Sequence, residues 1–188
     1  MSIDWKDIRY LNQGTERQKL AFKCLSSLNI FEDLSSFSPL LVGTIPINID
    51  IEESDLDIIC EVQNYSRFAN VLETLYRKYN RFEIHQTSIH VESSVIVCNF
   101  NYEGFNIEIF GQDCPVVEQN GYLHMIIEYR LLALAGLDAR DKIRQLKRLG
   151  LKTEPAFGKY FNIGGNLYTE LLTLGNLSDS ELKKKFNL

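Results

Sequence analysis

The sequence predicts an α+β fold, in which a small mixed β-sheet is flanked by helices and followed by a helical C-terminal extension. Short apolar runs of the kind that form strands occupy residues 37–114, which we expect to be the core. One capped helical pattern precedes them within residues 1–36. Longer helical patterns with capping residues fill residues 115–188. We expect these three regions to form a single domain over residues 1–188.

The composition is that of one soluble globular domain. The 188 residues are 45% apolar and 24% charged, which suffices for a substantial core. A formal net charge of -5 lacks the basic footprint of a dedicated nucleic-acid binder and argues against long nucleic acid as a partner. No apolar run approaches the roughly 20 residues of a membrane span, and the N-terminus has no apolar signal region. The cysteines lack a C-x-x-C pair and predict buried thiols in the cytoplasm: Cys24, Cys60, Cys98 and Cys114.

The first helix is predicted from a capping box at Thr15-x-x-Gln18. Its apolar stripe is expected to consist of Leu20, Ala21, Cys24, Leu25 and Leu28. A short strand over residues 39–42 should follow and end at Gly43. Isoleucines then alternate with other residues over 45–51, which predicts extended backbone that Pro46 limits.

The clearest strand covers residues 55–62. Period 2 puts Leu56, Ile58, Cys60 and Val62 on one face and Asp55, Asp57, Ile59 and Glu61 on the other. A helix capped by Ser66 should follow, with its apolar residues at Phe68, Val71, Leu72, Leu75, Tyr76 and Tyr79. A strand is predicted over 83–90, and a hairpin over 95–100 and 105–110 turns at Tyr102-Glu103-Gly104.

The last third of the chain is predicted to be helical. One helix should cover residues 122–135 and end near Gly136, and the next should cover 138–149 and end at Gly150. Shorter helices are expected over 155–161 and 168–174. A second capping box, Ser178-x-x-Glu181, predicts the terminal helix.

A cluster of acids is the main functional signal. Asp55 and Asp57 share a strand face, where two carboxylates repel each other unless a cation lies between them. Glu108, between two isoleucines, falls beside them if its strand is a neighbour with a matching face. Three carboxylates suit one or two Mg²⁺ or Mn²⁺ ions. The turn at Gly43-Thr44 can offer backbone N–H groups and a hydroxyl to a phosphate.

These motifs resemble the signature of the nucleotidyltransferase superfamily, which has the DNA polymerase beta-like fold. The match consists of Gly43-Thr44, ten residues, then Asp55-Leu56-Asp57-Ile58 and a later apolar-Glu108-apolar pattern, and it covers about residues 39–110. The wider wording GTIPINIDIEESDLDIICE, with KTEPAF at 152–157, also resembles an uncharacterised bacterial family of nucleotidyltransferase-like proteins.

The resemblance implies metal-dependent transfer of a nucleoside monophosphate from a nucleoside triphosphate. The acceptor would be a hydroxyl group on a small molecule, a protein or an RNA. Asp55, Asp57 and Glu108 would be metal ligands and catalytic acids, with Glu108 as general base for the acceptor hydroxyl. The residues implied to contact the nucleotide are Gly43, Thr44 and Ser54.

The sequence departs from the family pattern between the turn and the acids. Many minimal members carry an arginine there, whereas residues 45–54 (IPINIDIEES) contain no Arg or Lys and add Asp50, Glu52 and Glu53. A triphosphate would meet extra negative charge at this segment. We expect its cationic partners to come from Lys147 and Lys152, in a cluster that also contains Arg140, Lys142, Arg144 and Arg148.

Other interpretations remain open at the level of the sequence. The acid-rich segment favours a non-catalytic nucleotide-binding or protein-interaction module, antitoxin-like or regulatory, on the same fold. Ser54-Asp55-x-Asp57 also fits a turn with a helix cap, although LDIICEV after it is strand-like. No pair among His85, His90 and His124 has metal-ligand spacing, and His124 is predicted to be a surface or interface residue. A Ser/His/Asp or Cys/His triad stays open, although no G-x-S-x-G motif is present.

Overall fold

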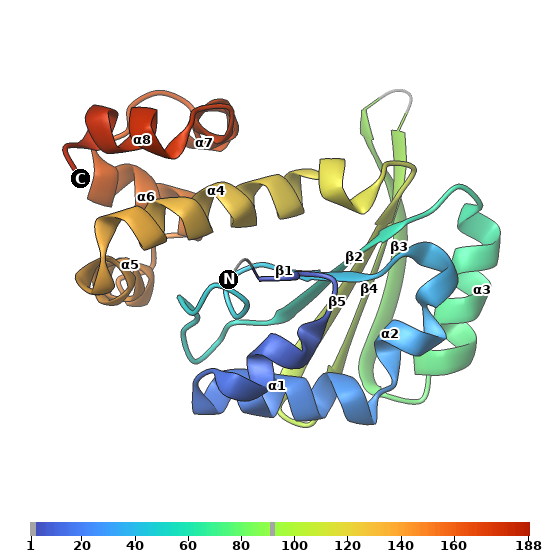
Figure 1. Ribbon diagram of the computed structural model, residues 1–188. Coiled ribbons are helices and arrows are strands. Elements are labelled where there is room, and N and C mark those ends of the chain that lie inside the picture. The colour runs from blue at the N-terminus through green and yellow to red at the C-terminus, as the bar shows by residue number, and fades with distance from the viewer. Residues whose placement is uncertain (1–2, 91–92) are drawn as a thin grey trace. The chain divides into compact units, whose positions relative to one another are not determined.

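A five-stranded mixed β-sheet forms the centre of the computed structural model, which describes residues 3–90 and 93–188 (Figure 1). Its strands are β1 (Leu40–Val42), β2 (Leu56–Glu61), β3 (Asn80–His90), β4 (Ser93–Tyr102) and β5 (Phe105–Gln112). The strand order is β1-β2-β5-β4-β3. β2 and β5 are parallel, and the other neighbours are antiparallel. The mixed sheet with flanking helices that the sequence predicts is confirmed.

The chain divides into two compact units. One consists of residues 1–46 and 54–119 and contains the sheet, and the other consists of residues 47–53 and 120–188. We call them the sheet unit and the helical unit and describe each by itself. The chain therefore leaves the sheet unit after Pro46 and returns to it at Ser54.

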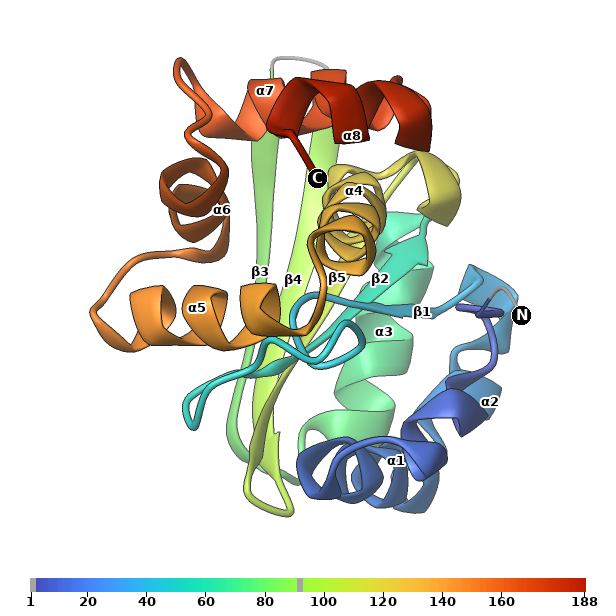
Figure 2. The same ribbon diagram turned by 60° about the vertical axis from the view of Figure 1, so that its left-hand side comes forward.

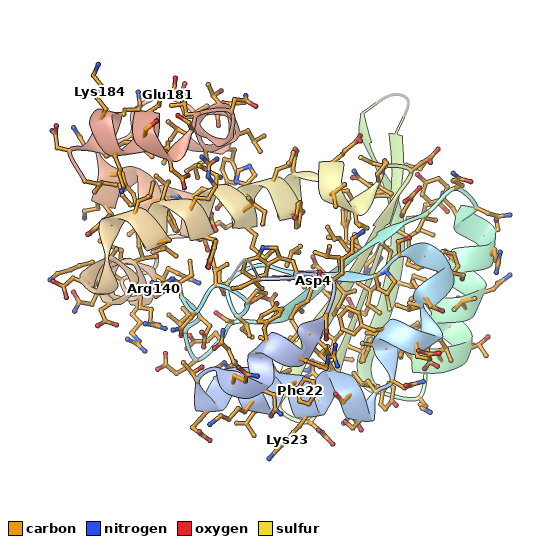
Figure 3. The ribbon with its side chains drawn as sticks, in the orientation of Figure 1. Asp4, Phe22, Lys23, Arg140, Glu181 and Lys184 are labelled. Carbon is orange, nitrogen blue, oxygen red and sulfur yellow. The ribbon has the colours of Figure 1, made fainter. Side chains whose placement is uncertain are left out.

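The core of the sheet unit lies between one face of the sheet and the helices before and between the strands. These helices are η1 (Ile8–Gln13), α1 (Glu16–Ser27), α2 (Ile30–Asp33), η2 (Ser35–Phe37) and α3 (Tyr65–Tyr76), and η3 (Val116–Glu118) follows β5. Leu56, Ile58 and Cys60 of β2 are fully buried in this core, as the strand pattern predicts. On the outer side of α1, Lys23 points away from the sheet (Figure 3).

Helix starts in the sheet unit follow from side-chain caps. Thr15 and Gln18 form the predicted capping box of α1. Leu20 is 54% exposed, so its assignment to the apolar stripe is wrong, whereas Ala21, which was also assigned to the stripe, is fully buried. The predicted cap Ser66 of α3 is also wrong. The cap is Asn64, whose side chain accepts a hydrogen bond from the Arg67 N–H at 2.9 Å and thereby satisfies a free donor of the first turn.

The predicted extended backbone over 45–51 is wrong. Residues 44–48 form turns, and Asn48 has a φ of 60°. The isoleucines at 45, 47 and 49 are nevertheless all buried. Their alternation therefore reflects burial within a turn rather than the pleat of a strand. The hairpin between β4 and β5 is confirmed, and its turn places Glu103 and Gly104 at φ 45° and 81°, as a type I′ turn requires.

The helical unit contains the five predicted C-terminal helices (Figure 2). They are α4 (Asn120–Ala135), α5 (Leu137–Arg148), α6 (Thr153–Phe161), α7 (Leu167–Gly175) and α8 (Asp179–Phe186). α4 contacts α5, α7 and α8, and α6 contacts α5 and α7. The capping box at Ser178 and Glu181 opens α8 as expected. Among the described residues, no helix combines the length and apolar character needed to cross a bilayer.

Candidate functional site

The structure brings the predicted acids of the sheet unit together on the face opposite the core. Asp57 of β2 and Glu108 of β5 are register partners on adjacent parallel strands, and both are half-buried. Asp55 is exposed and comes directly before β2. Burial, and then the charge of Asp55, raise the pKa of Glu108 above its usual range. Glu108 thus interacts electrostatically with Asp55 and is the register partner of Asp57.

The oxygens of these three acids do not converge on a single point. Among the described residues, one group of His, Cys, Asp or Glu has ligand atoms that all lie within 4.8 Å of one another, and it is His124, Glu128 and Glu154. Asp55, Asp57 and Glu108 would need side-chain rotation to surround one ion. Exposed Asp55 has the room to make that movement.

The Gly43-Thr44 turn lies directly against the Asp57 carboxylate. Gly43 has a φ of 84°, and a Cβ built there would come within 2.3 Å of Asp57 Oδ2. Only glycine therefore lets the backbone pass this close to the acid. Thr44 Oγ1 donates a hydrogen bond to Ser54 Oγ at 3.2 Å. The turn, Ser54 and Asp57 consequently form one continuous edge of the site.

The first turn of α1 holds both ends of the segment that joins this turn to the acids. Gln18 Nε2 donates to the carbonyls of Ile45 at 2.8 Å and Pro46 at 3.2 Å. Arg17 donates to the Ser54 carbonyl at 2.8 Å. The sequence did not reveal Arg17, because nothing in its neighbourhood links it to a carbonyl 37 residues away. An arginine does adjoin the candidate site, although it comes from α1.

The predicted cationic cluster binds the acid-rich segment 47–53 within the helical unit. Arg148 forms an ion pair with Glu52 at 3.0 Å. Lys147 is buried and donates to the Ile49 carbonyl at 3.1 Å, and Arg144 donates to the carbonyl and side chain of Asn48. Lys152 is exposed at the N-cap position of α6. Glu52, one of the three added acids of this segment, therefore has a cationic partner.

The sequence predicted His124 to be a surface or interface residue, and the surface alternative is wrong, because His124 is only 9% exposed. It lies on α4 four residues before Glu128, which is 4% exposed. His124 Nδ1 is 3.8 Å from Glu154 Oε1 of α6. Burial lowers the pKa of His124, which Glu154 partly offsets. Burial and then Glu154 raise the pKa of Glu128 well above its usual range, while Lys147 acts in the opposite direction.

A shallow pocket of about 600 Å³ lies along α3 and contains none of the predicted site residues. Its polar lining includes Asp33, Asn64, Arg67, Asn70 and Thr74. The pocket and the acid cluster are thus separate features of the sheet unit.

Comparison with protein families gives one match. A family model described as "Domain of unknown function (DUF4269)" matches residues 23–174. No curated protein has a matching sequence.

Solved structures share the fold at low sequence identity. The Cid1 poly(U) polymerase with MgGTP bound has a TM-score of 0.51 at 11% identity, over 87% of this chain and 51% of that chain. The polymerase core of TRAMP, an RNA surveillance complex, also has a TM-score of 0.51 at 11% identity, over 87% and 50%. Cid1 with Mg 3′-dATP bound gives 0.50 at 13% identity, over 87% and 51%. This chain spans about half the length of these structures, and the likeness shows the nucleotidyltransferase fold.

Proposed function

This chain belongs to the family described as domain of unknown function DUF4269, and we propose that it is a metal-dependent nucleotidyltransferase. It would move a nucleoside monophosphate from a nucleoside triphosphate to a hydroxyl group on a small molecule, a protein or an RNA. The observation that carries the proposal is the pairing of Asp57 with Glu108 on adjacent parallel strands, with Asp55 near enough to act on Glu108. The nucleotidyltransferase fold of the chain supports it.

The donor set fits a hard divalent cation. Asp55, Asp57 and Glu108 offer only carboxylate oxygens, the ligands that Mg²⁺ and Mn²⁺ prefer. Gly43 leaves space beside Asp57 Oδ2 that a Cβ would fill. The repulsion between Asp55 and Glu108 is a cost that a cation held by these residues would relieve. Bound there, the cation would neutralise charge on the triphosphate and on the leaving group.

The residues of the sheet unit have distinct roles in the proposed reaction. The hydroxyls of Thr44 and Ser54 and the backbone N–H groups of the Gly43 turn would hold the phosphates. The acceptor oxygen forms a bond to the α-phosphorus, the bond from that phosphorus to the bridging oxygen breaks, and pyrophosphate leaves with the electron pair. Glu108 takes the proton of the acceptor hydroxyl.

The lysines that the sequence suggests as cationic partners of the triphosphate, Lys147 and Lys152, both belong to the helical unit. Lys152 is exposed and free to extend, whereas Lys147 is buried and also holds Ile49. The alternative of a non-catalytic interaction module was favoured by the acid-rich segment. The ion pair of Glu52 with Arg148 weakens that argument, because it neutralises one of the added acids.

Thermal shift with ATP, GTP, CTP and UTP, with and without Mg²⁺, tests the proposal. At about 100 times its Kd, the preferred nucleotide should raise Tm by roughly 5–10 °C, and only with Mg²⁺ present. The double variant Asp55→Asn/Asp57→Asn should abolish this rise and the release of pyrophosphate, because the metal loses two of its ligands.

The matched control removes two exposed acids of the same unit, as Glu32→Gln/Glu73→Gln. This control should retain the full Mg²⁺-dependent rise. If no nucleotide shifts the wild-type Tm under any condition, the nucleotidyltransferase proposal fails and the interaction module becomes the better description.

A further inference from the structure

A second group of metal-ligand side chains lies inside the helical unit. His124 and Glu128 are four residues apart on α4, so they share one helix face, and Glu154 lies in the first turn of α6. One ligand atom from each lies within 4.8 Å of the others, the geometry that a single ion needs. No residue of this group belongs to the sheet unit that carries the acids.

Burial distinguishes this group from an ordinary patch of surface acids. Glu128 and His124 are 4% and 9% exposed. His124 Nδ1 has no hydrogen-bond partner among the described residues. Its separation of 3.8 Å from Glu154 Oε1 is too long for a hydrogen bond. A buried ring nitrogen that points to two carboxylates without a bond is an unsatisfied group in need of a ligand.

Electrostatic interactions around the group also favour a bound cation. Glu128 and Glu154 bring two carboxyl groups to the buried His124 ring. Lys147 of α5 is the cation whose charge acts on Glu128, and the Tyr168 ring of α7 packs 6.1 Å from the His124 ring. Burial and the repulsion from Glu154 disfavour an ionised Glu128 more than Lys147 favours it. A divalent cation among the three ligands would stabilise the ionised carboxylates.

We propose that His124, Glu128 and Glu154 form a binding site for a divalent transition metal, with Zn²⁺ as the best fit. An imidazole nitrogen with carboxylate oxygens suits Zn²⁺, whereas Mg²⁺ and Ca²⁺ prefer oxygen ligands throughout. The Glu154 side chain is 21% exposed, so this ligand faces the solvent and leaves a position for water. Three protein ligands and one water complete a tetrahedral zinc site.

The competing explanation is a buried polar network without metal, in which the charge of Lys147 stabilises an ionised Glu128. The test uses full-length protein, treated with a chelator and then freed of it. It is made in the Asp55→Asn/Asp57→Asn background, so that the sheet acids cannot contribute. Titration calorimetry with ZnCl₂ should show one equivalent bound, and Zn²⁺ should raise Tm while Mg²⁺ at the same concentration should not.

His124→Asn and Glu154→Gln, each added to that background, should weaken Zn²⁺ binding by at least about 100-fold, since each removes a direct ligand. The matched control is His85→Asn, which removes an exposed histidine that is 3.4 Å from a glutamate, Glu83. It should leave the affinity unchanged. Because Glu154 is partly exposed, Glu154→Gln should stay folded even if the histidine variant does not.

A zinc-soaked crystal gives the second measurement, an anomalous peak between α4 and α6. The proposal fails if Zn²⁺ does not bind saturably, or if the Glu154→Gln variant binds it as tightly as its parent. Since no nucleotide is present and the sheet acids are already removed, either outcome leaves the nucleotidyltransferase proposal untouched.

Discussion

At Gly43 the backbone passes so close to the Asp57 carboxylate that no side chain fits between them. A Cβ there would lie 2.3 Å from Asp57 Oδ2, and the positive φ of 84° already disfavours other residues. Asp57 Oδ2 is the far end of a side chain, so it can rotate away from an added methyl group. Position 43 therefore governs where the acid points more than whether the chain folds.

Gly43→Ala should thus separate stability from function. We expect it to cost about 1–2 kcal/mol through backbone strain and to remove the Mg²⁺-dependent nucleotide shift. Gly104→Ala is the control, because Gly104 has a φ of 81° and nothing within 4 Å of an added Cβ. Urea unfolding should give similar losses for the two variants, and thermal shift should show the nucleotide response in Gly104→Ala only. Equal nucleotide responses would contradict the proposed place of Gly43 in the site.

Glu108 lowers the stability of the native state by an amount that depends on pH. Burial and then Asp55 raise its pKa above the ordinary 4.5, so the native state binds this proton more tightly than the unfolded chain does. The resulting contribution to stability is full below pH 4.5 and is lost as the pH rises through the folded pKa. A buried acid that destabilises the native state at neutral pH is typical of a residue that is needed for chemistry.

Glu108→Gln should therefore raise Tm at pH 7.5 without divalent cations, by about 2–4 °C for each kcal/mol regained. At pH 4 the variant and the wild type should have nearly the same Tm, since the wild-type carboxyl is then protonated in both states. Differential scanning calorimetry at both pH values measures this. Glu73→Gln, on the exposed side of α3, is the control and should show no such pH-dependent gain. A gain at pH 4 as large as that at pH 7.5 would contradict the explanation.

At the scale of elements, α1 does more than cover the sheet. Its capping residue Gln18 accepts from the Thr15 N–H at 3.0 Å and also donates to the Ile45 carbonyl at 2.8 Å. Gln18 is 7% exposed, so these partners have little access to water. One side chain thus starts a helix and fixes the beginning of the segment that leads to the acids.

Gln18→Ala should cost about 2–3 kcal/mol, because it removes a cap and leaves buried carbonyls without a donor. Glu181→Ala is the matched control, since Glu181 holds the same position in the capping box of α8 but is exposed. It should cost only about 0.5–1 kcal/mol. Urea unfolding of both variants gives the comparison, and equal losses would show that Gln18 acts only as a cap.

Sequence patterns predicted elements whose signals are local. The capping boxes, the hairpin at Glu103-Gly104 and the inward row of β2 were all confirmed, because each depends on residues a few positions apart. The turns over 44–48 were missed, since buried isoleucines at every second position have the same period as the residues of a strand. The short helix α2 carries too few residues to show a period.

The residues of the candidate site also divide into those that local sequence patterns predict and those that they do not. Acids on strand faces follow from period 2, and the pairing of β2 with β5 brings Asp57 to Glu108. Arg17 and the group of His124, Glu128 and Glu154 could not be predicted in this way. Contacts between segments that are distant in the sequence bring these residues together. In addition, α4 is apolar on so many sides that its few buried polar residues produce no recognisable sequence pattern.

For the whole molecule, the division into units separates two kinds of donor chemistry. The sheet unit carries oxygen-only acids, and the helical unit carries a mixed nitrogen and oxygen group. Glu181 and Lys184 on α8 and Arg140 on α5 extend from the helical unit (Figure 3). Each site can therefore be inactivated by substitutions within its own unit, which makes the two proposals separable by experiment.

The segment 47–53 has a consequence for the order in which the protein is completed. Its contacts with Arg144, Lys147 and Arg148 span 96, 98 and 96 residues of sequence. During synthesis, segment 47–53 is made long before its partners on α5. Arg17 and Gln18 can hold the two ends of the link between Thr44 and Asp55 at that stage, but its middle lacks its partners until α5 has been made, and contacts this distant in sequence form late. Segment 47–53 should therefore be among the last parts of the newly made chain to become rigid.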